Sequence, residues 1–152
     1  DKNLSREIDI VFYLRSHKNK NTNIIINLAN YLSNKYKVVT VGEKIKNKNI
    51  INMGKINQKK LYNILQKTKY SFLSAENIYS FFSLDCLSNG VHVFYHRSYS
   101  PLTSLKKNMT AVNYYRLDVV KKLLEKKLKK TFKKQKKIIF KNKQDFSDYF
   151  KL

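Results

Sequence analysis

Basic side chains follow the first apolar run of this sequence, where they could stabilise a negatively charged group. Arg15 ends the run IDIVFYLR, and Lys18 and Lys20 come within the next five residues. Cations at the end of a strand can neutralise a diphosphate leaving group, which is the main electrostatic need when a group is transferred from a nucleotide donor. Lysines in loops are usually only solvated, so Arg15 is the strongest candidate of the three.

A second group of polar side chains lies between the apolar runs 70–74 and 91–96. Ser80 is suited to cap a helix over residues 81–89. The free backbone N–H groups at such a helix start, beside Tyr79 and Ser80, can hold a phosphate. The alternative interpretation is that Ser80 only caps the helix.

Three other polar residues of this segment have groups that can hydrogen-bond a sugar. Asp85 would lie one turn inside the helix among apolar neighbours, where its carboxylate needs a partner such as a ribose hydroxyl. Glu76 and Asn77 precede the helix in a polar loop. The structural alternatives are an Asp85 at the solvent edge of the helix and loop side chains that are merely solvated. The residues themselves leave both interpretations open.

The apolar pattern predicts the elements that must position these residues. Short runs rich in β-branched and aromatic residues indicate buried strands, and longer stretches have helical spacing. The expected strands are 8–15, 37–42, 49–54, 70–74, 91–96 and 110–114, and the expected helices are 22–34, 57–68, 81–89 and 117–130. This alternation predicts an α/β fold, a Rossmann-like doubly wound parallel sheet of about six strands. Open parallel sheets bind ligands at the carboxyl ends of their strands, where both polar groups lie.

The length and composition predict a single folded domain. The chain has 152 residues, 42% of them hydrophobic, and its three glycines and one proline leave no low-complexity linker. We expect residues 1–7 to be a linker or a processing remnant. Residues 131–152 are expected to form a basic C-terminal extension that docks on the domain. The common phosphate-binding fingerprints GxxxxGK[ST] and GxGxxG are absent.

The net charge of +22 indicates attraction to anionic partners. Lysine outnumbers arginine 28 to 4, and arginine is the residue preferred for reading bases and phosphates. Sequence-specific binding of nucleic acid is therefore not expected. Fourteen lysines lie between residues 106 and 143, so this segment is expected to contact an anionic membrane peripherally.

Neither a metal site nor a disulfide is expected. The single cysteine, Cys86, excludes an internal disulfide and is interpreted as a core residue. His92 and His96 are four residues apart but fall on a predicted strand, so they do not share a helical face. With no apolar run near ~20 residues and no signal-peptide pattern, the expected location is the cytoplasm, with peripheral contact at the inner membrane face.

Four segments, in order, resemble the C-terminal, donor-binding half of GT-B glycosyltransferases, in particular the retaining group 1 family. FYLRSHKNK resembles the family's strand that ends in Gly-Arg with a lysine five residues on, and YKVVTVGE resembles its second strand. INMGKINQKKLYNIL is similar to its strand–glycine–helix segment, and SAENIYSFFSLDCLSNGVHVF to its E-x7-E region. The resemblance spans roughly residues 8–130.

The resemblance implies roles for the basic residues and one glycine. Arg15 and Lys20 would be the catalytic residues that stabilise the donor diphosphate, and the loop after Gly54 would lie near the base. The donor would be a UDP- or GDP-linked sugar. No cofactor or metal would be needed, because basic side chains and a helix dipole stabilise the charge.

The resemblance also implies sugar and ribose contacts within the 70–96 segment. Asp85 stands where the family's second glutamate contacts ribose, and Asn77, next to Glu76, stands at the position of the first. Neither glutamate is in place, and Leu14 replaces the glycine that precedes the family's arginine. The expected fold does not depend on these positions.

The leading hypothesis is the nucleotide-sugar-binding half of a glycosyltransferase that transfers a sugar to a polysaccharide or glycolipid acceptor. An N-terminal acceptor domain would be missing from this chain, which is therefore expected to be inactive alone. The alternative is a non-catalytic basic α/β module that binds nucleic acid or an anionic membrane surface. A third possibility is a degenerate glycosyltransferase-like domain with a structural or interaction role.

Overall fold

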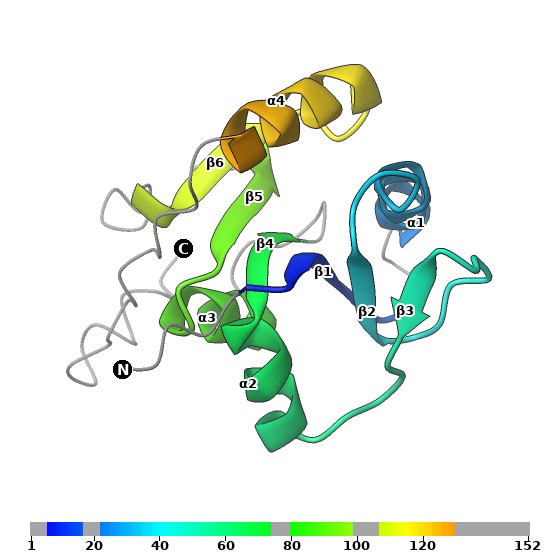
Figure 1. The fold of residues 1–152 in the computed structure, drawn as a ribbon, viewed down its shortest axis with the longest axis vertical. Helices are drawn as coiled ribbons and strands as arrows, with labels where there is room; N and C mark the ends of the chain where they lie inside the picture. The colour runs from blue at the N-terminus through cyan, green and yellow to red at the C-terminus, as the bar shows by residue number, and fades with distance from the viewer. Residues whose placement is uncertain (1–5, 17–21, 74–79, 99–106, 130–152) are drawn as a thin grey trace.

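The computed structural model describes residues 6–16, 22–73, 80–98 and 107–129, in which strands and helices alternate along the chain (Figure 1). The strands are β1 (Ile8–Leu14), β2 (Val38–Gly42), β3 (Ile50–Asn52), β4 (Thr68–Phe72), β5 (His92–His96) and β6 (Met109–Val112). The helices are α1 (Thr22–Leu32), α2 (Gln58–Gln66), α3 (Phe81–Ser88) and α4 (Leu117–Lys129). Each agrees with a predicted element to within a few residues.

All six strands form one parallel sheet in the order β3-β2-β1-β4-β5-β6. The register is continuous at the centre, where Phe12 of β1 lies opposite Thr40 of β2 on one side and Phe72 of β4 on the other. The first half of the chain extends the sheet outward from β1 in one direction, and the second half extends it in the other. The predicted Rossmann-like doubly wound fold is confirmed, and its strand order reverses between β1 and β4.

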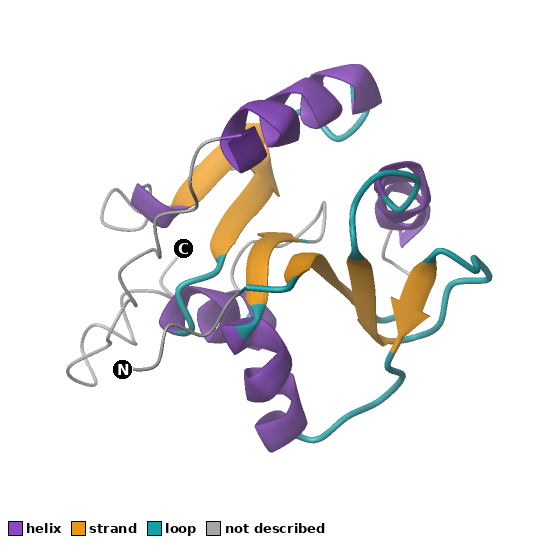
Figure 2. Ribbon diagram, viewed as in Figure 1, coloured by secondary structure: helices purple, strands orange, loops and turns teal. Residues whose placement is uncertain are grey.

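Helices cover both faces of the sheet (Figure 2). Ile10 and Phe12 of β1 join the apolar cluster under α1 and α4, while Val11, between them, joins the cluster under α2 and α3. This alternation follows from the period of two in strand side chains. Both faces of the central strand are therefore core, which explains why the strands are nearly continuous apolar runs.

Local capping signals fix where the helices begin and end. The side chain of Asn57 accepts a hydrogen bond from the backbone N–H of Lys60 at the start of α2, as the sequence predicts. Ser80 and Ser83 form a reciprocal capping box at the start of α3. Gly90, with φ of 70°, follows the end of α3 in the left-handed conformation expected for a helix stop.

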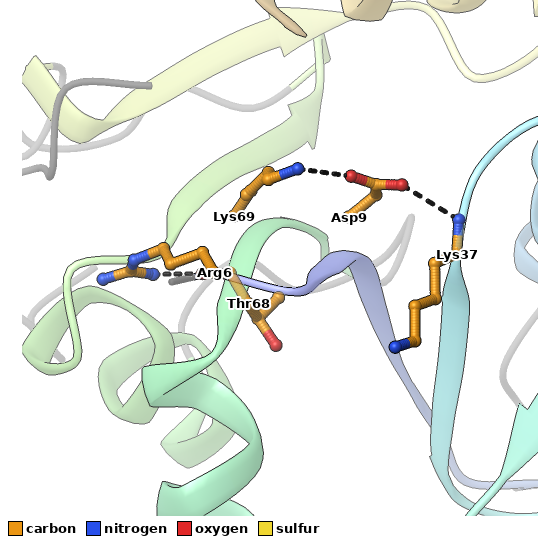
Figure 3. Close-up of polar contacts among 5 residues, drawn as sticks. All are labelled: Arg6, Asp9, Lys37, Thr68 and Lys69. Atoms are coloured by element: carbon orange, nitrogen blue, oxygen red, sulfur yellow. Dashed lines mark hydrogen bonds and ion pairs between the residues drawn. The ribbon is translucent and has the colours of Figure 1, made fainter. Parts of the chain in front are cut away.

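Polar contacts join three strands at the amino edge of the sheet (Figure 3). The Asp9 carboxylate of β1 accepts a hydrogen bond from the backbone N–H of Lys37 at 3.0 Å and pairs with Lys69 Nζ of β4 at 2.7 Å. Just before β1, the Arg6 guanidinium donates to the carbonyl oxygen of Thr68. Arg6 belongs to the segment 1–7 that was expected to be a linker, and it contacts the sheet directly.

A histidine lies inside the core on the α1 and α4 face. His92 of β5 is 4% exposed, between the rings of Tyr70 and Phe94, and its Nε2 lies 2.8 Å from Thr110 Oγ1. Burial lowers the pKa of His92 to about 3, and the positive charge of Lys127 acts in the same direction. His92 is thus a neutral core residue with a hydrogen bond, in line with its interpretation from the sequence.

The basic helix α4 packs its apolar side onto the sheet. The residues predicted to form this side all contact the core: Leu117, Val120, Leu123, Leu124 and Leu128. The opposite side of α4 exposes lysines to solvent, among them Lys122, Lys126 and Lys129. None of the described helices combines the length and the apolarity that crossing a bilayer requires.

Candidate functional site

A cleft of about 440 Å³ opens at the carboxyl edge of the sheet, beside β1. It lies between the ends of β1 and β2 and the loop that follows β3, and its polar lining includes Arg15, Ser16, Glu43 and Lys55. A volume of this order fits a small organic ligand. Open parallel sheets bind ligands outside the carboxyl ends of the strands, where the strand order reverses. β1 is one of the two strands at that reversal, and the cleft lies at its carboxyl end on the side of β2. This cleft is therefore the candidate site.

A carboxylate and a hydroxyl bridge the two strand ends across the cleft. The backbone N–H of Ser16 donates to Glu43 Oε1 at 2.7 Å, and the Ser16 hydroxyl donates to Glu43 Oε2. Both hydrogen bonds lower the pKa of the Glu43 carboxyl, and the one from the Ser16 hydroxyl has the larger effect. The positive charge of Lys55 acts in the same direction. Glu43 is therefore an ionised, positioned carboxylate at neutral pH.

Two glycines allow the backbone to form the base of the cleft. Gly42 ends β2 with φ of 96°, and its N–H donates to the carbonyl oxygen of Gly54 at 2.9 Å. The next N–H, of Glu43, donates to the carbonyl oxygen of Leu14 at 3.0 Å. A Cβ at Gly42 would come closer than 3.0 Å to that carbonyl oxygen. Only glycine at position 42 permits this close approach of β1 and β2.

Aromatic rings connect the cleft to the start of α3. Tyr13, at the end of β1, lines the cleft with 43% of its surface exposed. Its ring stacks on that of Phe82 with centroids 5.2 Å apart. Phe81, the first residue of α3, is 73% exposed. Tyr13 therefore offers a partly open, supported ring face to a ligand.

Of the residues predicted for the site, the structure brings one into the cleft and another to its border. Arg15 lines the cleft, as expected of a residue at the end of the first strand. Gly54 immediately precedes Lys55, a lining residue, and has a positive φ of 66°. Ser80 caps α3: its hydroxyl accepts from the Ser83 N–H at 3.2 Å, which confirms the capping interpretation. A phosphate contact at this helix start stays a prediction.

Asp85 has a partner within the protein. The hydroxyl of Tyr62, on α2, donates to the Asp85 carboxylate and itself accepts from Gln58 Nε2 at 2.7 Å. Burial raises the pKa of Asp85, and the Tyr62 hydrogen bond opposes that shift. Asp85 is partly buried between α2 and α3 and does not line the cleft. Its contact with ribose stays a prediction, and its need for a hydrogen-bond partner is already met.

The remaining predicted site residues lie outside the described part of the chain: Lys20, Glu76, Asn77 and Tyr79. The C-terminal extension 131–152 lies outside it as well. Their expected roles therefore stay predictions. Within the described residues, no group of three or more His, Cys, Asp or Glu side chains could hold a metal ion.

Sequence reasoning missed several lining residues, and three of them had a usable signal. Glu43 and Lys55 each directly follow a glycine at the end of a predicted strand, so their position at the carboxyl edge could have been inferred. Ser16 directly follows Arg15, the last residue of the predicted first strand. Tyr13 and Ile56 carried no such signal, because apolar and aromatic residues at strand ends look like core residues in the pattern.

Comparisons with known proteins show a likeness in fold and none in sequence family. No protein-family model matches the sequence, and no curated protein sequence matches it significantly. Among solved structures, a putative UDP-N-acetylglucosamine 2-epimerase from Listeria monocytogenes matches 79% of this chain with a TM-score of 0.51 at 11% identity. The apo structure of OtsA matches 88% of it with a TM-score of 0.52 at 11% identity.

Both likenesses, at 11% identity, concern the fold. The match covers only 37% of the epimerase chain and 39% of the OtsA chain. The chain thus spans less than two fifths of either neighbour, and the shared property is the fold of that part.

Proposed function

We propose that this chain is the nucleotide-sugar-binding part of a glycosyltransferase that transfers a sugar to a polysaccharide or glycolipid acceptor. The observation that carries the proposal is the cleft beside β1, which places Arg15 and Lys55 at the carboxyl edge of a doubly wound sheet, the edge at which such sheets bind ligands. The family resemblance in the sequence and the fold shared with the structural neighbours support the same function.

The chemistry of sugar transfer fits the charges at this cleft. When the bond between a sugar and a nucleoside diphosphate breaks, negative charge develops on the diphosphate. Arg15 and Lys55 both line the cleft and can stabilise that charge, and Lys20 would add to it. Side-chain cations are sufficient for this task, so the proposed reaction requires no bound metal or further cofactor.

The donor is proposed to be a UDP- or GDP-linked sugar. The name of the epimerase neighbour refers to a UDP-sugar, which supports a uridine nucleotide. Because the chain spans less than two fifths of that neighbour, a separate N-terminal domain is proposed to bind the acceptor. The isolated chain should then bind the donor without turnover.

The exposed lysines of α4 suit a peripheral contact with an anionic membrane at the cytoplasmic face. Because the apolar side of α4 is packed on the core, such a contact would be electrostatic. Binding to vesicles containing phosphatidylserine should therefore disappear at high salt. Binding that survives high salt would contradict an electrostatic contact.

Calorimetric titration with UDP and GDP tests the donor site. Arg15→Gln should weaken nucleotide binding about tenfold, since hydrogen bonds to charged groups contribute roughly 1.5–3 kcal/mol. Arg116→Gln is the matched control, because Arg116 is exposed and pairs with Asp118 away from the cleft.

Two results would contradict the proposal. Failure of the folded chain to bind either nucleotide would remove the donor site. Inorganic pyrophosphate binding as tightly as the nucleotides, with a steep loss at high salt, would favour the alternative of a basic module that binds anions without regard to their base or sugar.

A further inference from the structure

We propose that Glu43 binds the ribose of the nucleotide in this cleft by accepting hydrogen bonds from its 2′- and 3′-hydroxyls. This inference rests on the proposed function, since it concerns the same ligand and the same cleft. It assigns a role to a residue that the sequence patterns did not single out, and it moves the ribose contact from Asp85 on α3 to the end of β2.

The position of Glu43 in the fold supports this role. It directly follows Gly42, the last residue of β2, and it lines the cleft. In doubly wound sheets of this strand order, a carboxylate downstream of the first strand and helix hydrogen-bonds the ribose of a bound dinucleotide. The present sheet has that order, and its central strand β1 lies beside β2.

The carboxylate of Glu43 has free capacity and a fixed orientation. An ionised carboxylate offers about four lone-pair sites, and Ser16 occupies one on each oxygen. The Glu43 side chain is exposed, so the remaining sites are open to the cleft. Because Ser16 already holds the carboxylate in place, binding a diol would require little further ordering of the side chain.

The rest of the lining matches the parts of a nucleoside diphosphate. The half-exposed ring of Tyr13 and the apolar side chain of Ile56 are suited to the base. Arg15 and Lys55 are suited to the phosphates. Glu43 is the acidic residue among these lining groups, and a carboxylate attracts hydroxyl donors while it repels phosphate. The sugar hydroxyls are therefore its natural partners.

Asp85 is less suited to the same task. Its carboxylate already accepts a hydrogen bond from Tyr62 and lies between two helices, outside the lining of the cleft. A ribose hydroxyl at Asp85 would have to displace the Tyr62 hydroxyl or share the Asp85 carboxylate with it. Glu43 requires no such rearrangement.

The experiment compares ribonucleotides with 2′-deoxyribonucleotides. Chains of all 152 residues, as the wild type, Glu43→Gln and Glu7→Gln, are titrated calorimetrically with UDP and dUDP, and with GDP and dGDP. Glu7 is an exposed glutamate just before β1 at the amino edge, so Glu7→Gln is a matched control for the loss of one carboxylate. A Glu43→Asp variant keeps the charge and shortens its reach, and circular dichroism verifies that each variant is folded.

The wild type should prefer the ribonucleotide about tenfold, as expected for hydrogen bonds to a charged group. Glu43→Gln should remove most of this preference, because it weakens binding of the ribonucleotide more than binding of the deoxyribonucleotide, which has only its 3′-hydroxyl to lose as a partner. Glu43→Asp should reduce the preference. Glu7→Gln should leave it intact. Removing the carboxylate and removing the 2′-hydroxyl each weaken binding, and their effects on the binding free energy should not add, because both break the same hydrogen bond.

The outcomes separate the inference from the function on which it rests. If the wild type binds the nucleotides and Glu43→Gln retains the ribose preference, the inference is wrong and the donor site stands. Loss of the preference in Asp85→Asn alone would assign the ribose to α3 and also overturn it. If the folded wild type binds no nucleotide, the proposed function and the inference both fail.

Discussion

Acidification should destabilise this protein through His92. His92 is 4% exposed, and its pKa falls from an ordinary 6.5 to about 3 in the folded chain. Between these two values the unfolded chain binds a proton that the folded chain does not. The free energy of unfolding is therefore highest above pH 6.5, and it decreases as the pH falls toward 3.

The size of the effect follows from the difference between the two pKa values. Each pH unit inside the window changes the free energy of unfolding by about 1.4 kcal/mol. Going from pH 7 to pH 4.5 should therefore cost about 2.5 kcal/mol through this group, and the full effect approaches roughly 5 kcal/mol. Ordinary domains unfold at a cost of about 5–15 kcal/mol, so the loss would be readily measured.

Urea denaturation followed by circular dichroism at several pH values between 7 and 4.5 measures this dependence. His92→Phe keeps a ring beside Tyr70 and Phe94 and removes the titrating group. Over that pH range its free energy of unfolding should therefore decrease by about 2.5 kcal/mol less than that of the wild type. Contributions from carboxylates are common to both chains and cancel in the difference. Thr110→Val removes the hydrogen-bond partner of His92 and keeps the histidine, so its free energy of unfolding should depend on pH as steeply as that of the wild type.

The reasoning would be refuted if the wild type and His92→Phe lost stability in parallel. That result would mean that His92 becomes charged in the folded chain at nearly its ordinary pKa. Burial next to aromatic rings and Lys127 would then not prevent its protonation.

Two further predictions concern the cleft and its surroundings. Gly42→Ala should lower the free energy of unfolding by about 3 kcal/mol, because positive-φ strain adds to a clash with the Leu14 carbonyl oxygen. Gly54→Ala should cost about 1 kcal/mol, because it has the strain but makes only an ordinary van der Waals contact with the Lys44 side chain. Equal losses in urea denaturation would show that the clash is relieved. Tyr62→Phe should raise the pKa of Asp85 further, because it removes a hydrogen bond that favours the carboxylate. An unchanged Asp85 titration in carboxyl-detected NMR would contradict that hydrogen bond.

Much of the fold could be predicted because its signals are local. β-branched and aromatic runs identified the strands, and helical spacing identified the face of α4 that packs on the core. Helix caps also depend on neighbours within a few residues, so they can be predicted from the sequence. Examples are the capping by Asn57 and Ser80 and the positive φ of Gly90. Alternating strands and helices then restrict the topology to a doubly wound parallel sheet.

The candidate site was predicted only where a residue's place on a strand decided its location. Arg15 ends β1, so its position at the carboxyl edge followed from the alternation of elements. Asp85 was interpreted from its apolar neighbours as a carboxylate in need of a ligand. Its actual partner, Tyr62, lies 23 positions earlier on another helix, and only helix packing brings the two together.

The sequence by itself determined the elements, their caps, the parallel sheet and the edge at which ligands would bind, because each depends on short-range periodicity or backbone preference. The tertiary structure alone decided which side chains meet at that edge. Ser16 and Glu43 are 27 positions apart and contact one another because β1 and β2 pair in one register and because Gly42 lets the strand ends approach. Such contacts depend on packing between distant segments, which no local pattern in a single sequence specifies.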